Sequence, residues 1–320
     1  MSISVGVDIG GTKIAASAVS ATGEILHRAR RDTPAQDPDL IVAAVAETVA
    51  ELTEVCRGEG GQVGAVGVAC AGFIDRRGET VVFAPNLAWR DEPLKARVEA
   101  ATGLPVVLEN DANAAAWGEF RFGAARTADD VTMVTLGTGV GGGIVVAGEL
   151  LRGAHGMGAE VGHLRVVPDG HRCGCGNRGC WEVYASGSAL VREARELVAQ
   201  GSPHAGALSD RCGGDPQQLD GEMVTQVARD GDPAALELLE DVGRWTGEGL
   251  ASLAAVLDSG LLVVGGGVSA AGDLVLEPAR AAFARNLTGR GYRTPSPIVP
   301  AALGNDAGMV GVADLAARRT

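Results

Sequence analysis

The sequence predicts an α/β protein built from two related halves, chiefly because one local pattern occurs twice. Residues 131–143, VTMVTLGTGVGGG, are typical of a buried strand that ends in a glycine-rich turn. Residues 5–13, VGVDIGGTK, repeat this order near the start of the chain. Each turn offers backbone N–H groups to phosphate oxygens. At 320 residues the chain also exceeds the size at which a single hydrophobic core usually stops growing.

The composition indicates a compact globular protein and excludes two classes of main partner. Hydrophobic residues make up 46% of the chain but aromatic residues only 3%, so the core must consist of Ala, Val, Leu and Ile. The net charge of −13 argues against nucleic acid or an anionic membrane, because both select clustered positive charge. We find no long apolar run and no basic segment leading into one, and we therefore expect a cytoplasmic protein.

The first half is predicted to open with an antiparallel meander, since tight turns rather than helices separate its first three strands. Asp37 is a typical N-cap and Pro38 a typical first-turn residue, so a helix is expected from there to about Arg57. The expected strands lie at 3–8, 14–19, 25–33, 63–69 and 106–110, with a short helix near 93–102.

The second half is predicted to restart with a strand, a glycine turn and a strand, and to become mainly helical afterwards. A helix from Asp111 to about Phe122 precedes it, and residues 201–220 are expected to form a polar loop. The later helix from about 305 has Asn305 or Asp306 as its cap. Strands are expected at 131–137, 143–147 and 261–269, with further strand-like segments between 147 and Val167. Helices are expected at 182–200, 221–230, 232–257, 273–289 and 305–317.

Residues 137–142 also fit the spacing G-x-G-x-x-G, with Glu160 about twenty residues further on, as in a dinucleotide-binding site. Such a site requires a helix that begins in the glycine loop, so that its N-terminus meets the pyrophosphate. The β-rich segment IVVAGEL follows here instead. We therefore interpret the glycines as a hairpin and reject an NAD-dependent oxidoreductase.

Hydroxyl and charged side chains accompany both glycine turns. Thr12 and Thr138 each follow a glycine, and hydroxyl donors there suit phosphate oxygens. Asp8 ends the first strand and has two interpretations, which remain open. It is either a turn-forming aspartate or a carboxylate that orients a hydrated Mg²⁺ ion.

Asp111 joins a strand to a helix and also has two interpretations. An aspartate at this position commonly serves as an N-cap. A carboxylate at the end of a strand, kept ionised by the helix dipole, also suits a base that accepts a hydroxyl proton in phosphoryl transfer. The two roles can coexist.

Cysteine and histidine residues cluster in a glycine-rich loop. They form the pattern H-x9-C-x-C-x4-C, which supplies four ligands for a closed tetrahedral zinc site. Four protein ligands leave no position for a reactive water, so we predict a structural zinc ion. His171 competes with His163 as the nitrogen ligand, and spacing alone does not separate them. The predicted ligands are His163, Cys173, Cys175 and Cys180.

These motifs together resemble the ROK family of sugar kinases and repressors, most closely its glucokinase branch. The cysteine motif with the preceding E-x-G-H is specific to that family, whereas D-x-G-G-T occurs more widely among sugar kinases. The matching segments are DIGGTK at 8–13, ENDANAAAWGE at 109–119, LGTGVGGGI at 136–144, GAEVGH at 158–163, CGCGNRGCWE at 173–182 and VVGGGVS at 263–269.

The resemblance implies an actin-like ATPase (ribonuclease H-like) fold, in which two α/β domains close on a cleft and the final helix returns to the first domain. We assign 1–110 plus 304–320 to a small domain and 111–303 to a large domain with the zinc loop and helical insertions. The resemblance also implies ATP-dependent phosphorylation of a hexose, most simply glucose, at its 6-hydroxyl, with Mg²⁺ as cofactor and a homodimer or homotetramer as the assembly.

Residue roles follow from the resemblance position by position. Asp111 corresponds to the catalytic base, and Asp8 lies beside the phosphates. The implied hexose-binding residues are Gly72, Asn110, Asp111, Glu160, His163 and Glu182. The implied nucleotide-binding residues are Gly11, Thr12, Lys13, Thr138 and Gly139 for the phosphates and Gly265, Gly266 and Gly267 for adenosine.

Glu160 and His163 are three residues apart, so on a straight strand they would face opposite sides. A turn or bulge near Gly162 must therefore bring both to the sugar. His163 can then hold zinc with one ring nitrogen and donate the other N–H to a sugar hydroxyl, which makes the zinc ion indirectly functional.

Two alternatives to a glucose kinase remain. A kinase for N-acetylmannosamine, N-acetylglucosamine or fructose would use similar polar groups. A sugar-responsive repressor without catalytic activity would carry a helix-turn-helix domain ahead of the D-x-G-G-T strand. Asp8 lies almost at the start of this acidic chain, so we do not expect such a domain here.

Overall fold

The computed structural model describes residues 2–319, which form two compact units. Unit 1 runs to Thr132 and includes Gly143–Ala159 and the described residues from Ala301 onward; unit 2 comprises Met133–Gly142 and Glu160–Pro300. These ranges differ from the predicted domains, 1–110 plus 304–320 and 111–303. The segment after residue 110 belongs to unit 1 because its helix packs on the C-terminal helix. Residues 1 and 320 of the predicted ranges lie outside the described residues.

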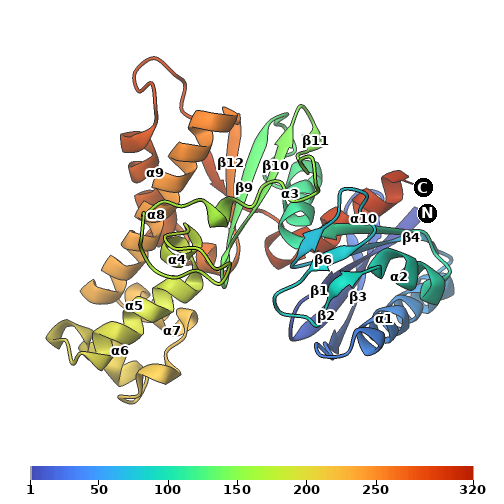
Figure 1. Ribbon diagram of the computed structural model, residues 1–320, viewed down its shortest axis with the longest axis horizontal. Coiled ribbons are helices and arrows are strands. Elements are labelled where there is room, and N and C mark those ends of the chain that lie inside the picture. The colour runs from blue at the N-terminus through green and yellow to red at the C-terminus, as the bar shows by residue number, and fades with distance from the viewer. Residues whose placement is uncertain (1, 320) are drawn as a thin grey trace. The chain divides into compact units, whose positions relative to one another are not determined.

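Unit 1 is built on a five-stranded sheet with the order β3-β2-β1-β4-β8 (Figure 1). The first three strands pair antiparallel, which confirms the predicted meander, and β1, β4 and β8 run parallel. Asp37 caps α1 as predicted, since its side chain accepts hydrogen bonds from the Asp39 and Leu40 N–H groups. The elements are β1 (Ser2–Ile9), β2 (Lys13–Ser20), β3 (Ile25–Asp32), α1 (Pro38–Gly58), β4 (Gln62–Cys70), α2 (Leu94–Thr102) and β8 (Val106–Asn110).

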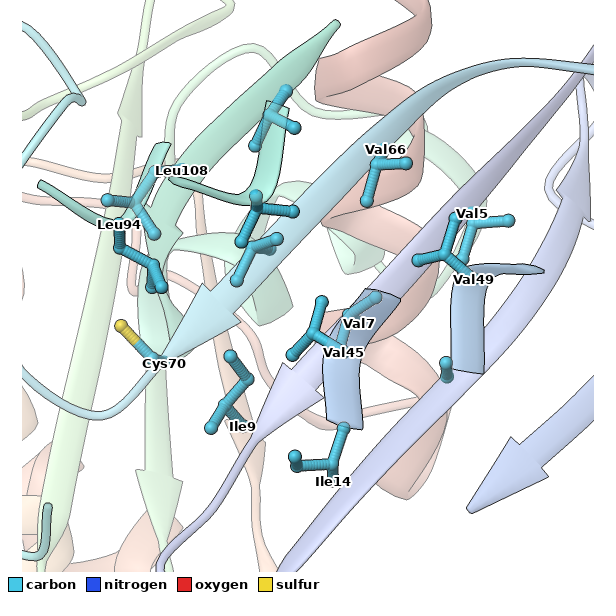
Figure 2. Close-up of a cluster of buried hydrophobic side chains, with 14 of the residues drawn as sticks. Val5, Val7, Ile9, Ile14, Val45, Val49, Val66, Cys70, Leu94 and Leu108 are labelled. Atoms are coloured by element: carbon cyan, nitrogen blue, oxygen red, sulfur yellow. The ribbon is translucent and has the colours of Figure 1, made fainter. Parts of the chain in front are cut away.

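One face of this sheet forms the hydrophobic core with α1 and α2. Alternate strand residues point to this face, as the pleat of a β-strand requires. Figure 2 shows them gathered with the apolar side chains of the two helices. The labelled members, all fully or almost fully buried, are Val5, Val7, Ile9, Ile14, Val45, Val49, Val66, Cys70, Leu94 and Leu108.

The opposite face carries glycines and packs against α10 (Ala307–Arg319) at backbone distance. A Cβ atom on Gly6 would lie 2.0 Å from the Met309 carbonyl oxygen, and one on Gly67 would lie 2.0 Å from that of Val312. Only glycine permits so close an approach of helix to strand. The final helix therefore returns to unit 1, as expected, and it is seated directly on the sheet.

Helix α3 (Asp111–Phe122) packs on α10 in the same way. A Cβ atom on Gly311 would lie 1.9 Å from the Ala114 carbonyl oxygen. On the other side of the contact, a Cβ atom on Gly118 would lie 2.3 Å from the Ala307 carbonyl oxygen. The sheet, α10 and α3 thus form one closely packed block.

The chain segment that joins β4 to α2 forms a small antiparallel sheet, which was not predicted. Its strands are β5 (Phe73–Ile74), β6 (Val81–Phe83) and β7 (Arg90–Glu92), paired in that order. Strands of two or three residues are too short to show an alternating pattern, so sequence periodicity could not reveal them.

The second sheet has the order β11-β10-β9-β12-β13. Its strands are β9 (Val131–Leu136), β10 (Val140–Val146), β11 (Glu149–Leu150), β12 (Leu261–Gly265) and β13 (Ile298–Pro300). In unit 2, helices α8 (Pro233–Leu257) and α9 (Asp273–Asn286) lie side by side (Figure 1). No helix within residues 2–319 combines the length and apolar character needed to cross a membrane.

Several predicted elements of unit 2 have different bounds in the structure. The helix expected at 182–200 is two helices, α4 (Glu182–Ala185) and α5 (Gly187–Ala199), because Ser186 adopts an extended conformation and caps α5. The loop expected at 201–220 contains α6 (Gly206–Arg211), and α7 (Gly221–Arg229) follows it. The strand expected at 261–269 ends at Gly265, since Gly266 has a φ of 85°. Strand-like segments were expected between β11 and Val167. In that range the structure has one bridge residue, Arg165, which pairs with Cys180.

We predict that Gly67→Ala lowers the free energy of unfolding by roughly 2–3 kcal/mol, because the new methyl group would collide with the α10 backbone. Gly64→Ala is the matched control, since it lies on the same strand and its Cβ would meet no atom within 4 Å. Its effect should stay within about 0.5 kcal/mol. Denaturant unfolding of both variants measures the difference, and equal losses would contradict the packing role of Gly67.

Candidate active site

Strand β8 delivers Asn110 and Asp111 to the carboxyl edge of the parallel strands. Asn110 pairs with Cys70 at the end of β4, and Asp8 of β1 lies one register position before that edge. Ligands of open α/β sheets bind outside the carboxyl ends of strands. Asp8 and Asp111, which are far apart in sequence, are therefore brought to one edge of the unit 1 sheet.

Asn110, not Asp111, is the N-cap of α3. The Asn110 Oδ1 atom accepts hydrogen bonds from the N–H groups of Ala112 at 2.9 Å and Asn113 at 3.1 Å. Its Nδ2 group donates to the Gly72 carbonyl at 3.2 Å. The capping interpretation of Asp111 is thus wrong, because the preceding amide already fills that position, and Asp111 is the first helical residue.

Burial makes both carboxyl groups at this edge harder to ionise. It raises the pKa of Asp111, and the N–H groups of Ala112 and Asp111 itself only partly oppose that shift. Burial, together with the neighbouring charge of Asp111, raises the pKa of Asp8 to about 6, while Lys13 lowers it. Two neighbouring half-buried carboxylates favour a bound cation or a proton, so this pair suits both a magnesium ligand and a general base.

The first glycine turn is a tight connection between β1 and β2. The Gly10 N–H donates to the Lys13 carbonyl at 3.0 Å. Thr33 holds the turn from one side, because its hydroxyl donates to the Gly10 carbonyl at 2.7 Å and its N–H donates to the Thr12 carbonyl at 3.1 Å. The side chains of Thr12 and Lys13 are exposed, so their donors are available to a ligand.

Gly72 lies against the end of β6, and Gly11 lies against the loop that follows this strand. A Cβ atom on Gly72 would lie 2.8 Å from the Phe83 carbonyl oxygen, so only glycine fits there. A Cβ atom on Gly11 would lie 3.2 Å from the Cβ of Asn86. Asn86 is exposed and had no role in the sequence interpretation, which offered no local signal for it.

In unit 2, the second glycine turn is a β-hairpin, which confirms the rejection of a dinucleotide fold. The Gly137 N–H donates to the Gly139 carbonyl at 3.0 Å, and β10 follows directly where a dinucleotide site would need a helix. The Gly187 N–H, at the start of α5, donates to the Gly137 carbonyl at 2.8 Å. A Cβ atom on Gly139 would lie 2.5 Å from Glu182 Oε2, so this turn abuts the segment after the cysteine loop.

The cysteine loop gathers the four predicted ligands. One donor atom from each of His163, Cys173, Cys175 and Cys180 lies within 4.8 Å of the others. The Cys175 and Cys180 sulfurs are 3.7 Å apart, and Cys173 Sγ is 3.6 Å from His163 Nδ1. Two sulfurs bound tetrahedrally to one zinc ion would lie about 3.8 Å apart, so this donor set fits zinc.

Tertiary structure also separates the two candidate histidines. The His171 ring packs against Tyr184, with ring centroids 5.5 Å apart, and this histidine is not part of the ligand cluster. His163 ends a 3-10 turn, Val161–His163, which is the predicted bend near Gly162. The Nδ1 atom of His163 faces Cys173, and its Nε2 atom lies 4.0 Å from Glu160 Oε2. The two ring nitrogens thus face different partners, Nδ1 the cysteine cluster and Nε2 the Glu160 carboxylate.

Glu182 lies between the cysteine cluster and the second glycine turn. Its Oε1 atom is 2.8 Å from Cys173 Sγ and 3.7 Å from His163 Nδ1. Its Oε2 atom faces Gly139, as described above. The position of this carboxylate therefore depends on both loops.

A cavity of about 1230 Å³ lies in unit 2 beside the second glycine turn. It is lined by Thr138 and Gly267 and by residues of α5 and α7. Of the three glycines predicted to contact adenosine, Gly267 lines the cavity, whereas Gly265 ends β12 and Gly266 packs against the Leu136 backbone.

The chain is similar to known proteins along nearly its whole length. The family model described as "ROK family" matches residues 4–319. A glucokinase of Streptomyces coelicolor is 48% identical over 320 residues, covering 99% of this chain and 98% of the relative. A glucokinase of Thermotoga maritima is 36% identical, covering 98% of this chain and 97% of the relative. A crystal structure of a ROK family glucokinase from Streptomyces griseus in complex with glucose and AMPPNP is 50% identical, with a TM-score of 0.88 and coverage of 99% of both chains.

We predict that Asp8→Asn stabilises the ligand-free protein in a pH-dependent way. Because folding raises the pKa of Asp8 from 3.8 to about 6, its contribution to stability is present below pH 4 and is lost as the pH rises through 6. The stability of the asparagine variant relative to wild type should therefore increase as the pH rises from about 4 to above 6. At neutral pH this gain should reach at most about 3 kcal/mol.

Denaturant unfolding at a series of pH values in magnesium-free buffer measures this gain. Asp91→Asn is the control, since Asp91 is exposed. A constant difference between Asp8→Asn and wild type across the pH range would contradict the prediction.

Proposed function

The chain belongs to the ROK family, and on this basis we propose that it transfers the γ-phosphoryl group of ATP to the 6-hydroxyl of glucose. Its fold is the actin-like ATPase fold that the resemblance implied. The full-length similarity to glucokinases, one of them in complex with glucose and AMPPNP, supports both the reaction and its substrates. Within the chain, Asp111 is the observation on which the proposal rests, because it is a half-buried carboxylate at the carboxyl edge of parallel strands and its pKa is raised.

Asp111 is the general base of the proposed reaction. It accepts the proton of the sugar hydroxyl while that oxygen attacks the γ-phosphorus, and ADP leaves with the electrons of the broken P–O bond. A raised pKa makes the carboxylate a stronger proton acceptor than an exposed aspartate. Asn110 and Gly72 form a hydrogen-bonded pair beside the base and provide further polar contacts for the hexose.

The hexose-binding residues of unit 2 are Glu160, His163 and Glu182. The Nε2 atom of His163 faces Glu160, so the ring nitrogen and the carboxylate can engage neighbouring hydroxyl groups of one sugar. Glu182 comes two residues after the proposed zinc ligand Cys180 and its Oε2 atom lies close to Gly139, which limits its freedom before the sugar binds.

The two glycine turns would bind the phosphates of ATP. The first contributes Gly11, Thr12 and Lys13, whose backbone N–H, hydroxyl and ammonium groups suit phosphate oxygens. The second contributes Thr138 and Gly139. Adenosine would occupy the cavity lined by Gly267, next to the predicted Gly265 and Gly266. A magnesium ion bound with ATP supplies charge neutralisation, and Asp8 would orient its water ligands.

The zinc ligands would be His163, Cys173, Cys175 and Cys180. With four protein ligands the ion keeps no open position, so its role is structural. Its proposed contribution is to fix His163 and Glu182 for the hexose. A homo-oligomeric state and a cytoplasmic location stay predictions from the sequence.

We predict that the wild-type protein releases ADP with glucose, and that Asp111→Asn lowers kcat by about a thousandfold while glucose still binds. The expected loss is the typical contribution of a general base. A coupled ADP assay over a panel of hexoses measures activity, and calorimetry measures binding. Asp91→Asn, an exposed aspartate, should behave like wild type. Activity on N-acetylated sugars alone would contradict the proposal that glucose is the substrate.

We predict that Cys175→Ser loses bound zinc and weakens glucose binding. Cys175 is exposed, so the serine itself disturbs little packing. Cys212→Ser makes the same chemical change outside the cluster and should retain the metal. Elemental analysis and calorimetry give the two readouts. Full glucose affinity in a verified zinc-free protein would refute the coupling between metal and sugar.

A further inference from the structure

An ion pair between a buried carboxylate and a half-buried arginine lies close to the proposed base in the chain. Glu109, the residue before Asn110, is only 4% exposed. Its Oε2 atom accepts a hydrogen bond from Arg152 Nε at 2.7 Å. Arg152 follows β11 and is 43 residues further along the chain, so only the tertiary structure brings the two side chains together.

The other oxygen of Glu109 holds residues on both sides of Asp111. Its Oε1 atom accepts hydrogen bonds from the Asn110 N–H at 3.1 Å and from Asn113 Nδ2 at 3.0 Å. Asn113 is itself 2% exposed and lies in the first turn of α3. Asp111 therefore lies between two residues that one carboxylate fixes.

Arg152 belongs to a segment that has little freedom of its own. Its carbonyl accepts a hydrogen bond from the Gly158 N–H at 2.9 Å. In the loop that this bond closes, a Cβ atom on Gly156 would lie 2.4 Å from the Ile74 carbonyl oxygen, so the loop packs closely against β5. The guanidinium thus reaches Glu109 from an ordered part of unit 1.

Stability alone does not account for a charged pair at this position. Removing the Glu109 carboxylate from water costs several kcal/mol, and an apolar pair of similar size often stabilises a protein as well or better. Charge-assisted hydrogen bonds to both oxygens of a carboxylate do, however, fix its orientation. A general base needs that orientation, because a displacement of about 1 Å can lower a rate by a hundredfold.

We infer that Glu109 and Arg152 are positioning residues for Asp111, and that their ion pair sets the rate of phosphoryl transfer without contacting the nucleotide. The inference rests on the proposed function, because it assigns these residues a role in the reaction for which Asp111 is the base. Neither side chain touches the reacting atoms; both act through Asn110, Asn113 and the start of α3.

The test compares Glu109→Gln and Arg152→Gln with Glu92→Gln. Glu92 is a matched control, because it is also a buried carboxylate of unit 1 paired with an arginine: Arg97 Nη1 lies 2.6 Å from Glu92 Oε1. The side chains of that pair are 11% and 30% exposed, against 5% and 27% for Glu109 and Arg152. All variants are assayed with glucose and MgATP at a temperature below the onset of unfolding of each.

We expect Glu109→Gln and Arg152→Gln each to lower kcat by tenfold or more, with the KM for MgATP within twofold of wild type. Glu92→Gln should lose thermal stability to a similar extent but keep its kcat. Arg152→Lys keeps the charge and should recover part of the loss. If Glu109→Gln does not fold, the Arg152 variants provide the same comparison.

Wild-type kcat in fully folded Glu109→Gln and Arg152→Gln would overturn the inference, as would an equal loss of kcat in Glu92→Gln. The proposed function is tested separately by the wild-type protein, and it would be contradicted if that protein did not phosphorylate glucose. A wild-type protein that phosphorylates glucose, together with fully active Glu109 and Arg152 variants, would therefore reject the positioning role alone.

Discussion

Direct contact between the backbone of α10 and the backbone of the unit 1 sheet is the constraint on which the candidate site depends. At Gly6 and Gly67 the α10 backbone lies directly against the strand backbone, while their neighbours on the same strands fill the core on the other face. Both faces of β1 and β4 are thus covered, and their carboxyl ends are held at a fixed edge. Asp8 and Asp111 lie at that edge because the sheet cannot shift beneath α10.

The same close packing extends to α3, whose first residue is the proposed base, Asp111. Gly118 and Gly311 allow α3 and α10 to touch along their backbones. The fully buried Glu119 adds a polar connection, because its carboxylate accepts hydrogen bonds from the N–H groups of Ala302 and Leu303, just before α10. The helix that begins with Asp111, the proposed base, is thereby anchored near both ends, by Glu109 and Asn110 at the start and by Glu119 towards the end.

In unit 2, the segments that carry the candidate hexose-binding residues are held in place differently. Its hexose-binding candidates lie on or next to irregular loops, where no sheet fixes the backbone. Four candidate metal-ligand atoms lie within 4.8 Å of one another there, and a bound ion would hold His163 and the cysteine loop together. Glu182 then links that cluster to the glycine turn at Gly139. Each unit is thus ordered in its own way, unit 1 by backbone packing and unit 2 by a cluster of candidate metal ligands.

The sequence by itself determined the features that depend on neighbouring residues. The meander, the Asp37 cap, the hairpin after Gly137 and the bend near Gly162 all follow from local turn, cap and periodicity rules. Only the tertiary structure decided between competing partners. It made Asn110 the cap of α3, faced His163 rather than His171 toward the cysteines, formed the short strands β5 to β7 and joined Glu109 to Arg152. Such choices depend on distances between segments far apart in the chain, and no local pattern encodes those distances.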